Sequence, residues 1–184
     1  MYTLHINLSK TATRQYLLSV LMDELDAAQR DSVESQMSRT NLSAEHYHRL
    51  AEVEDAIEGT GLPAEVRADA RAVYHILAEA EAAVHGVPVD QTHFHEVGDA
   101  EAVRNVIAVC LAVHELSPVR IVATPVQTGS GKVRCAHGLL DIPAPATAAI
   151  LARGIPTCAQ TVEGEQCTPT SAALIAHFVK EFEA

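Results

Sequence analysis

A long amphipathic segment between Pro63 and Gly86 constrains the fold of this chain more than any other feature. Apolar residues recur along it at three- and four-residue steps, while charged residues occupy the other faces; this pattern indicates a helix with one buried side. Pro63 suits the first turn of such a helix, and Gly86 followed by Pro88 ends it. The apolar stripe consists of Val66, Ala70, Val73, Leu77, Ala80 and Val84. We expect this helix to pack on a sheet, because its stripe must be buried against another element.

The composition predicts one globular domain spanning residues 1–184. A chain of 184 residues with 48% hydrophobic residues is long enough for one substantial core and short for two. The net charge of −11 argues against a nucleic acid as partner. No apolar run reaches the roughly 18 residues of a membrane span, and the first residues lack a signal-peptide pattern. We therefore expect a cytoplasmic protein without a membrane partner, whose four cysteines, which form no CxxC pair, are reduced thiols.

The other periodicities predict an α+β fold, with a mixed sheet and hairpins packed against several amphipathic helices. The near-continuous apolar segment 119–126 is expected to be the central strand of the sheet. A further strand is expected at 3–9, and further helices at 13–28, 43–59, 99–117, 145–154 and 168–179.

Turn residues predict two hairpins and one mobile segment. The central strand would turn at 128–132 into a returning strand at 133–142. A second hairpin is expected where segments 157–161 and 165–167 flank the Glu163-Gly164 turn. The polar, serine-rich segment 29–42 shows no apolar period and is interpreted as a mobile loop.

The motif HFHEVG carries three polar side chains suited to metal or proton chemistry: His93, His95 and Glu96. In an extended segment the two histidines share one face and Glu96 points to the other. Neutral imidazole is a ligand for nickel, zinc, copper and iron, and a nearby carboxylate can ligate, orient a histidine or move a proton. An HxH pair fixes no third ligand by itself, so the alternative of simple surface histidines stays open. The remaining histidines, His85 among them, follow helix and strand patterns and are interpreted as surface or core residues.

A second cluster places Cys135 and His137 two residues apart, on one face of the expected strand. They form a soft-donor pair for a metal ion. Nucleophilic catalysis by the thiol is an alternative, although a base two residues along a strand rarely reaches the thiol.

Two further segments are candidates for anion binding. Gly129-Ser130-Gly131-Lys132 is not a P-loop, because a strand rather than a helix follows the lysine, but its turn amides could bind an anion. Thr168 begins a helix and offers a hydroxyl and free amides, for which helix capping is the simpler explanation.

Three blocks, HFHEVG, TPVQTGSGKVRCAHGLLDIPAPATAAIL and VEGEQCTPTSAALIA, resemble the amino-terminal region of the LarC family of nickel-insertion proteins. Those proteins insert nickel into a pyridinium bis(thiocarboxylic acid) mononucleotide, the precursor of the nickel-pincer cofactor, in a CTP-dependent manner. The resemblance implies that this precursor is a partner and that nickel is bound. With the motifs above, it assigns Glu96 a catalytic role. The expected metal ligands are His93, His95, Cys135 and His137, and the expected cofactor-binding residues are Ser130, Lys132 and Thr168.

The chain departs from the family at its first loop and in its length. Where the family has DCxSGxSGDM, this chain has INLSKTATRQ at 6–15, so that Lys10 replaces a glycine and Arg14 an acid. We expect this change to favour anions over a bare divalent ion. The family's carboxy-terminal region, associated with nucleotide use, has no counterpart here, so CTP is expected only with a separately encoded carboxy-terminal half.

Several functional alternatives follow from these departures. The first is a nickel-insertion subunit, whose enzyme class would be that of a metallochelatase or lyase. A non-catalytic metal- or nucleotide-binding accessory protein that retains the fold is the second. A metal-dependent hydrolase with Glu96 as base is the third. A homo-oligomer is compatible with each of them.

Overall fold

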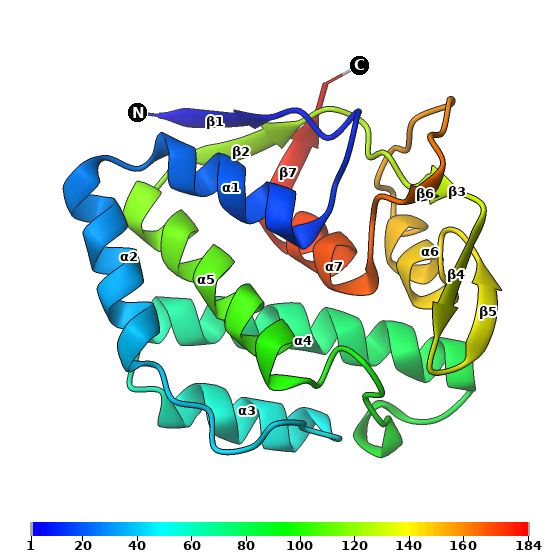
Figure 1. Ribbon diagram of the computed structural model, residues 1–184, viewed down its shortest axis with the longest axis horizontal. Coiled ribbons are helices and arrows are strands. Elements are labelled where there is room, and N and C mark those ends of the chain that lie inside the picture. Colours follow the sequence, from blue (N-terminus) through cyan, green and yellow to red (C-terminus); the bar gives the residue numbers. More distant parts are fainter. Residues whose placement is uncertain (1, 184) are drawn as a thin grey trace.

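The computed structural model describes residues 2–183 and has the expected α+β architecture, with helices outnumbering short strands (Figure 1). The strands are β1 (Thr3–Ile6), β2 (Arg120–Ala123), β3 (Gly129–Ser130), β4 (Lys132–Cys135), β5 (Gly138–Asp141), β6 (Gly164–Glu165) and β7 (Val179–Phe182). The helices are α1 (Arg14–Glu24), α2 (Ala27–Arg39), α3 (Leu50–Gly59), α4 (Ala64–His85), the 3-10 helix η1 (Val89–Gln91), α5 (Ala100–Leu116), α6 (Pro145–Leu151) and α7 (Pro169–Phe178).

The main sheet has three strands in the order β1-β2-β7, so β2 is central as predicted. Both pairings of β2 are parallel, which makes this sheet parallel throughout, in place of the expected mixed one. Ile121, Val122 and Ala123 are buried, whereas Val119 is 62% exposed; the strand is therefore shorter than the apolar segment that predicted it.

The two predicted hairpins are wrong. Since β1 and β7 occupy both edges of β2, no edge remains for a returning strand. Segment 133–142 instead contributes to a hairpin of its own, in which β4 pairs antiparallel with β5 around a turn at Ala136 and His137. Likewise β6 pairs with β3 rather than with segment 157–161. The β3–β6 approach is so close that a Cβ on Gly129 would lie 1.8 Å from the Gly164 carbonyl oxygen.

The helix α4 forms as predicted but does not pack on the sheet. Its stripe is buried from Val66 to Ala80, whereas Val84 at its end is 41% exposed. The neighbours of the helix are α3, α5, α6 and α7. The apolar side chains of the sheet face α1, α5 and α7 instead. The sheet is too small to cover both helix layers, so α4 forms the second layer (Figure 1).

The expected mobile loop at 29–42 is also wrong, because most of it is helix α2. Asp26 and Gln29 form a capping box at its start. One apolar side chain of this helix, Val33, is buried, at 2% exposed. Polar contacts also hold the helix in place: the Gln29 side-chain amide donates to the Glu115 backbone carbonyl at 2.7 Å, and the Ser32 hydroxyl donates to the Glu115 carboxylate at 2.8 Å. A helix anchored by polar contacts has no apolar period to reveal it.

Local capping signals place most of the other helix ends. Thr13, Asp99 and Thr168 accept hydrogen bonds from backbone amides of the first turns of α1, α5 and α7, and Gly86 ends α4 in the left-handed conformation. The helix expected from Ser43 begins later, at Leu50. None of the helices within residues 2–183 is long and apolar enough to cross a membrane.

Candidate functional site

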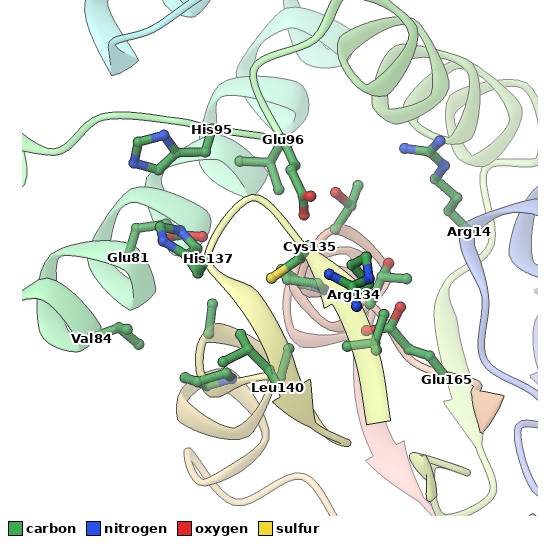
Figure 2. A pocket seen from close by; sticks show the side chains of 18 of the residues that line it. Arg14, Glu81, Val84, His95, Glu96, Arg134, Cys135, His137, Leu140 and Glu165 are labelled. Carbon is green, nitrogen blue, oxygen red and sulfur yellow. The ribbon is translucent and has the colours of Figure 1, made fainter. Parts of the chain in front are cut away.

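A cavity of about 490 Å³ opens where the end of α4, the loop 92–99, the β4–β5 hairpin and the first turns of α1 and α7 meet (Figure 2). Its lining includes histidines, carboxylates, arginines and a thiol. The lining residues used below are Arg14, Glu81, His85, His95, Glu96, Arg134, Cys135, His137, Glu165, Thr168 and Thr170.

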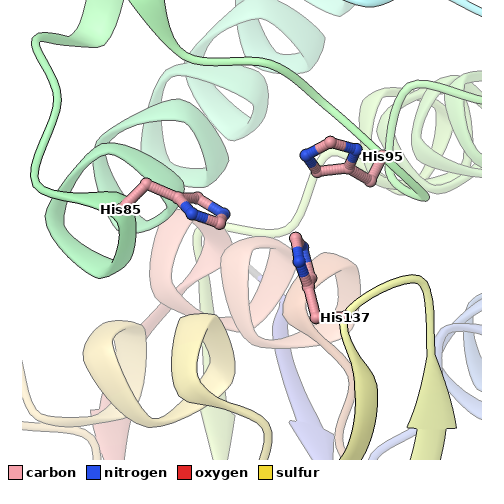
Figure 3. Close-up of side chains that lie close together, drawn as sticks. All are labelled: His85, His95 and His137. Atoms are coloured by element: carbon pink, nitrogen blue, oxygen red, sulfur yellow. The ribbon is translucent and has the colours of Figure 1, made fainter.

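Three histidines converge on one side of this cavity: His85, His95 and His137 (Figure 3). Each offers a ring nitrogen, and these nitrogens lie within 4.8 Å of one another. Three atoms 4.8 Å apart lie about 2.8 Å from their common centre, against a metal–nitrogen bond of about 2.0–2.1 Å. Side-chain rotations that move each ring by less than about 1 Å would therefore close the group around one ion.

Helix geometry places His85. It is the last residue of α4, where Gly86 turns the chain away. The ring nitrogen Nε2 lies 3.4 Å from the Glu81 carboxylate, one helical turn back. A carboxylate behind a ligating imidazole fixes the ring and raises its basicity.

Buried neighbours hold the loop that carries His95. Phe94 is 1% exposed and packs edge-on against Tyr74, with ring centroids 5.8 Å apart. The Tyr74 hydroxyl donates to the Val97 carbonyl at 2.8 Å. Because Phe94 and Val97 point inward, His95 and Glu96 are left exposed at the cavity.

Gly98 brings this loop against a second segment. The Tyr47 amide donates to the Gly98 carbonyl at 2.7 Å, and a Cβ at Gly98 would lie 1.8 Å from the Tyr47 carbonyl oxygen. Only glycine permits this approach, so the final residue of HFHEVG has a structural role.

The hairpin turn between β4 and β5 places His137. The Ala136 amide, in the same turn, donates to the Glu96 carboxylate at 3.0 Å. Glu96 thereby ties the His137 turn to the His95 loop. The rings of His95 and His137 are 4.7 Å apart and nearly perpendicular.

Burial and neighbouring charges shift two groups at the histidines. Partial burial, and then the charges of His137 and His85, lower the pKa of His95, which favours the neutral, metal-binding imidazole. Burial raises the pKa of Glu81, and the neighbouring histidines oppose this shift.

The structure brings together some of the sequence-predicted residues and separates others. Cys135 and Thr168 line the cavity with His95, Glu96 and His137. The Cys135 sulfur does not belong to the group of ligand atoms that lie within 4.8 Å of one another. Thr168 uses its hydroxyl to cap α7.

Three other predicted residues lie outside this group. His93 is exposed and is replaced in the cluster by His85. Ser130 donates to the Val162 carbonyl at 2.9 Å, and Lys132 pairs with Asp141 across the hairpin; neither lines the cavity.

Sequence reasoning missed His85 and Glu81. Both lie on the apolar-striped helix, where a histidine is readily interpreted as a surface residue. The available signal was position: His85 immediately precedes the helix-ending Gly86, which leaves its side chain at the tip of α4 rather than along its face. The chain then returns through η1 to His95.

Comparison with known proteins agrees with the blocks that carry the resemblance. The family model described as "Nickel insertion protein" matches residues 3–184. No solved structure gives a significant match.

Curated relatives are between a third and a half identical in sequence to this chain over the aligned residues. A putative nickel insertion protein of Methanosarcina mazei is 43% identical over 145 residues, which are 77% of this chain and 37% of the relative. A pyridinium-3,5-bisthiocarboxylic acid mononucleotide nickel insertion protein of Staphylococcus saprophyticus is 38% identical over 166 residues, 88% of this chain and 42% of the relative. The chain thus spans less than half the length of these relatives. With the family model matching nearly its whole length, the chain belongs to the nickel insertion protein family.

Proposed function

We propose that this chain binds a nickel ion as cargo at His85, His95 and His137 and presents it to a pyridinium bis(thiocarboxylate) mononucleotide. The observation that carries the proposal is the convergence of three imidazoles, from three separate elements, on one wall of one cavity. Imidazole is a good ligand for nickel. The acceptor is the one named for the Staphylococcus saprophyticus relative.

The open arrangement of the cluster suits transfer better than storage. All three histidines are exposed, and three protein ligands leave coordination positions for a ligand from solvent. Cys135 lines the same cavity and is the candidate for a fourth, sulfur ligand. A sulfur-containing acceptor entering this cavity would compete for the same ion, since soft sulfur ligands bind nickel well.

Glu96 has two roles in this proposal. Its carboxylate holds the Ala136 amide and so positions the His137 turn. It also lies beside ligands that must be deprotonated when a metal binds, and we assign it the role of proton acceptor there.

Nucleotide use is assigned to the part of the family protein that these 184 residues do not match. The relatives extend well beyond the matched region, so we propose that CTP-dependent insertion requires a carboxy-terminal half as partner. A non-catalytic accessory protein is the second candidate. It is favoured by Arg14, which lines the cavity where the family pattern has an acid.

Nickel titration of the whole chain tests the binding step. We expect one nickel per chain, and a loss of roughly 100-fold in affinity for His137→Ala, because apparent energies of about 10–16 kcal/mol for four-ligand sites correspond to about 3 kcal/mol per ligand. His114→Ala, on α5 and outside the cavity, is the matched control. Equal affinity of both variants would contradict the proposed site.

Transfer is tested separately. The chain is mixed with nickel, CTP, the nucleotide precursor and a carboxy-terminal half from a relative, and the nucleotide is analysed for nickel by mass spectrometry. Nickel in the nucleotide supports insertion. Nickel that stays bound to the protein, with none in the nucleotide, identifies the accessory protein.

A further inference from the structure

We propose that the side of the cavity facing the histidines is an anion subsite, built by Arg14, Arg134 and Thr170, which holds a phosphate or carboxylate group of the ligand while the histidines hold the metal. The identity of the ligand as a pyridinium nucleotide rests on the proposed function; the anion subsite itself rests on the features described next.

Within residues 2–183, neither Arg14 nor Arg134 forms an ion pair with a carboxylate, although both line the cavity. Four other arginines are paired with a carboxylate: Arg67 and Arg71 with Glu58, Arg120 with Glu181, and Arg153 with Glu79. Arg30, Arg39 and Arg104 donate to backbone carbonyls instead. A free guanidinium in a cavity offers a planar set of donors that matches phosphate and carboxylate oxygens.

Thr170 supplies an independent observation. It is only 3% exposed, yet its hydroxyl makes no hydrogen bond with any residue that the structure describes. Among the described residues, Thr147 has the one side-chain oxygen that is both fully buried and without a hydrogen-bond partner. The Thr170 oxygen also has no partner, so it is not fully buried and is accessible from the cavity that Thr170 lines. A nearly buried hydroxyl without a protein partner is costly and is available as a donor to a ligand.

The position of Thr170 adds to its preference for an anion. It lies in the first turn of the ten-residue helix α7, where the helix dipole favours negative charge. Thr168 and Ser171 satisfy each other's polar groups in the capping box, so they do not compete for the Thr170 hydroxyl.

Three carboxylates line the same cavity and work against an anion: Glu81, Glu96 and Glu165. Glu81 lies beside His85, and the surroundings of the other two limit their effect. Burial, and then the charge of Glu96, raise the pKa of Glu165, which makes the ionised form of Glu165 less favourable. Glu96 is engaged by the Ala136 amide. Any negative charge that remains suits a pyridinium ring, which is positively charged.

The anion and metal positions are separate. Figure 2 shows Arg14 on the opposite side of the cavity from His95 and His137, with Cys135 and Glu96 between them. One ligand could therefore place an anionic group at Arg14 and another group at the metal.

Calorimetric titration of the whole chain, without nickel, tests this subsite. Two probes are used. The first is nicotinic acid mononucleotide, a pyridinium carboxylate with a phosphate, and the second is its nucleoside, which lacks the phosphate. We expect Arg14→Gln and Thr170→Val to weaken nucleotide binding about tenfold, since one charge-assisted hydrogen bond contributes on this scale. Arg39→Gln, which removes the same charge from the exposed face of α2, should change affinity less than about twofold. Arg134→Gln is the second variant if Arg14→Gln does not fold.

The two probes separate the anionic groups. If Arg14→Gln weakens the nucleotide but not the nucleoside, the phosphate is seated at Arg14; if it weakens both equally, the carboxylate is. Either result supports the subsite. Equal losses for Arg14→Gln and Arg39→Gln, or no binding of the nucleotide by the unmodified chain, would overturn it.

Nickel titration of Arg14→Gln distinguishes this proposal from the proposed function. We expect this variant to bind nickel at least as tightly as the unmodified chain, because it removes a positive charge that repels a cation in the same cavity. If the unmodified chain fails to bind nickel but shows the Arg14-dependent nucleotide affinity, the metal proposal fails and the anion subsite stands.

Discussion

The two sides of the cavity are built in different ways. The histidine wall (His85, His95 and His137) consists of exposed residues at a helix end, in a loop and in a hairpin turn. The arginine wall (Arg14, Arg134 and Thr170) draws two of its members from the first turns of helices α1 and α7, where Arg14 is half-buried and Thr170 buried.

The two walls therefore depend on different kinds of contact. The histidine wall depends on contacts between segments distant in sequence, such as Glu96 with Ala136 and Gly98 with Tyr47. In the arginine wall, Arg14 and Thr170 depend on helix caps that each segment forms by itself, while Arg134 lies on β4. We therefore expect the histidine wall to be the more easily disrupted of the two.

Replacing a histidine in the cluster should have the largest effect. His85→Ala should reduce nickel affinity roughly 100-fold, as expected for loss of one ligand, whereas His93→Ala should change it by less than about threefold. Both affinities are measured by calorimetric titration. A greater loss for His93→Ala would restore the HxH pair as the site and remove His85 from the histidine wall.

Gly98→Ala should break the support of the histidine wall. The new methyl group would overlap the Tyr47 carbonyl oxygen, and we expect a destabilisation of about 2 kcal/mol or more, which lowers the Tm by about 5 °C. Gly59→Ala is the control, because a Cβ there meets nothing within 4 Å. Equal melting temperatures for the two variants would show that the loop moves to accept the methyl group.

Glu81→Gln tests whether the carboxylate beside His85 supports metal binding by that histidine. Losing the carboxylate that orients a ligating imidazole typically weakens metal binding 10–100-fold, and we expect the lower end because the contact is 3.4 Å. Glu79→Gln, two residues away and paired with Arg153, is the matched control for nickel titration. If Glu79→Gln loses as much affinity, the effect belongs to the charge of α4 rather than to the Glu81–His85 contact.

Glu165→Gln, on the side of the arginine wall, should have the smallest effect. Burial and Glu96 raise the pKa of Glu165 above its usual 4.5, so the folded state holds this proton more tightly and stability decreases as the pH rises from the unfolded pKa through the folded one. The variant cannot ionise and should therefore melt slightly higher at pH 7, with the difference vanishing below about pH 4. Because the group is partly exposed, screening keeps the gain small. Thermal melts at both pH values measure it, and a difference that is the same at both would contradict the assigned cause.

Part of the candidate site was accessible from sequence. His95, Glu96, Cys135, His137 and Thr168 were all named as candidates and all line the cavity. The motifs identify residue types suited to the chemistry, and the resemblance to the nickel-insertion family assigns these residues to one site. His85 was not accessible in this way, because its role depends on where α4 ends relative to two other segments.

By itself, the sequence determined the local elements: the α4 stripe with its end at Gly86, and the caps at Thr13, Asp99 and Thr168. These depend on hydrogen bonds and periodicity within a few residues. Only the tertiary structure decided that β2 pairs in parallel on both edges, that α4 packs on helices, and that His85 rather than His93 joins the cluster. Such outcomes depend on which distant segments exclude water from one another, and local patterns do not encode that choice.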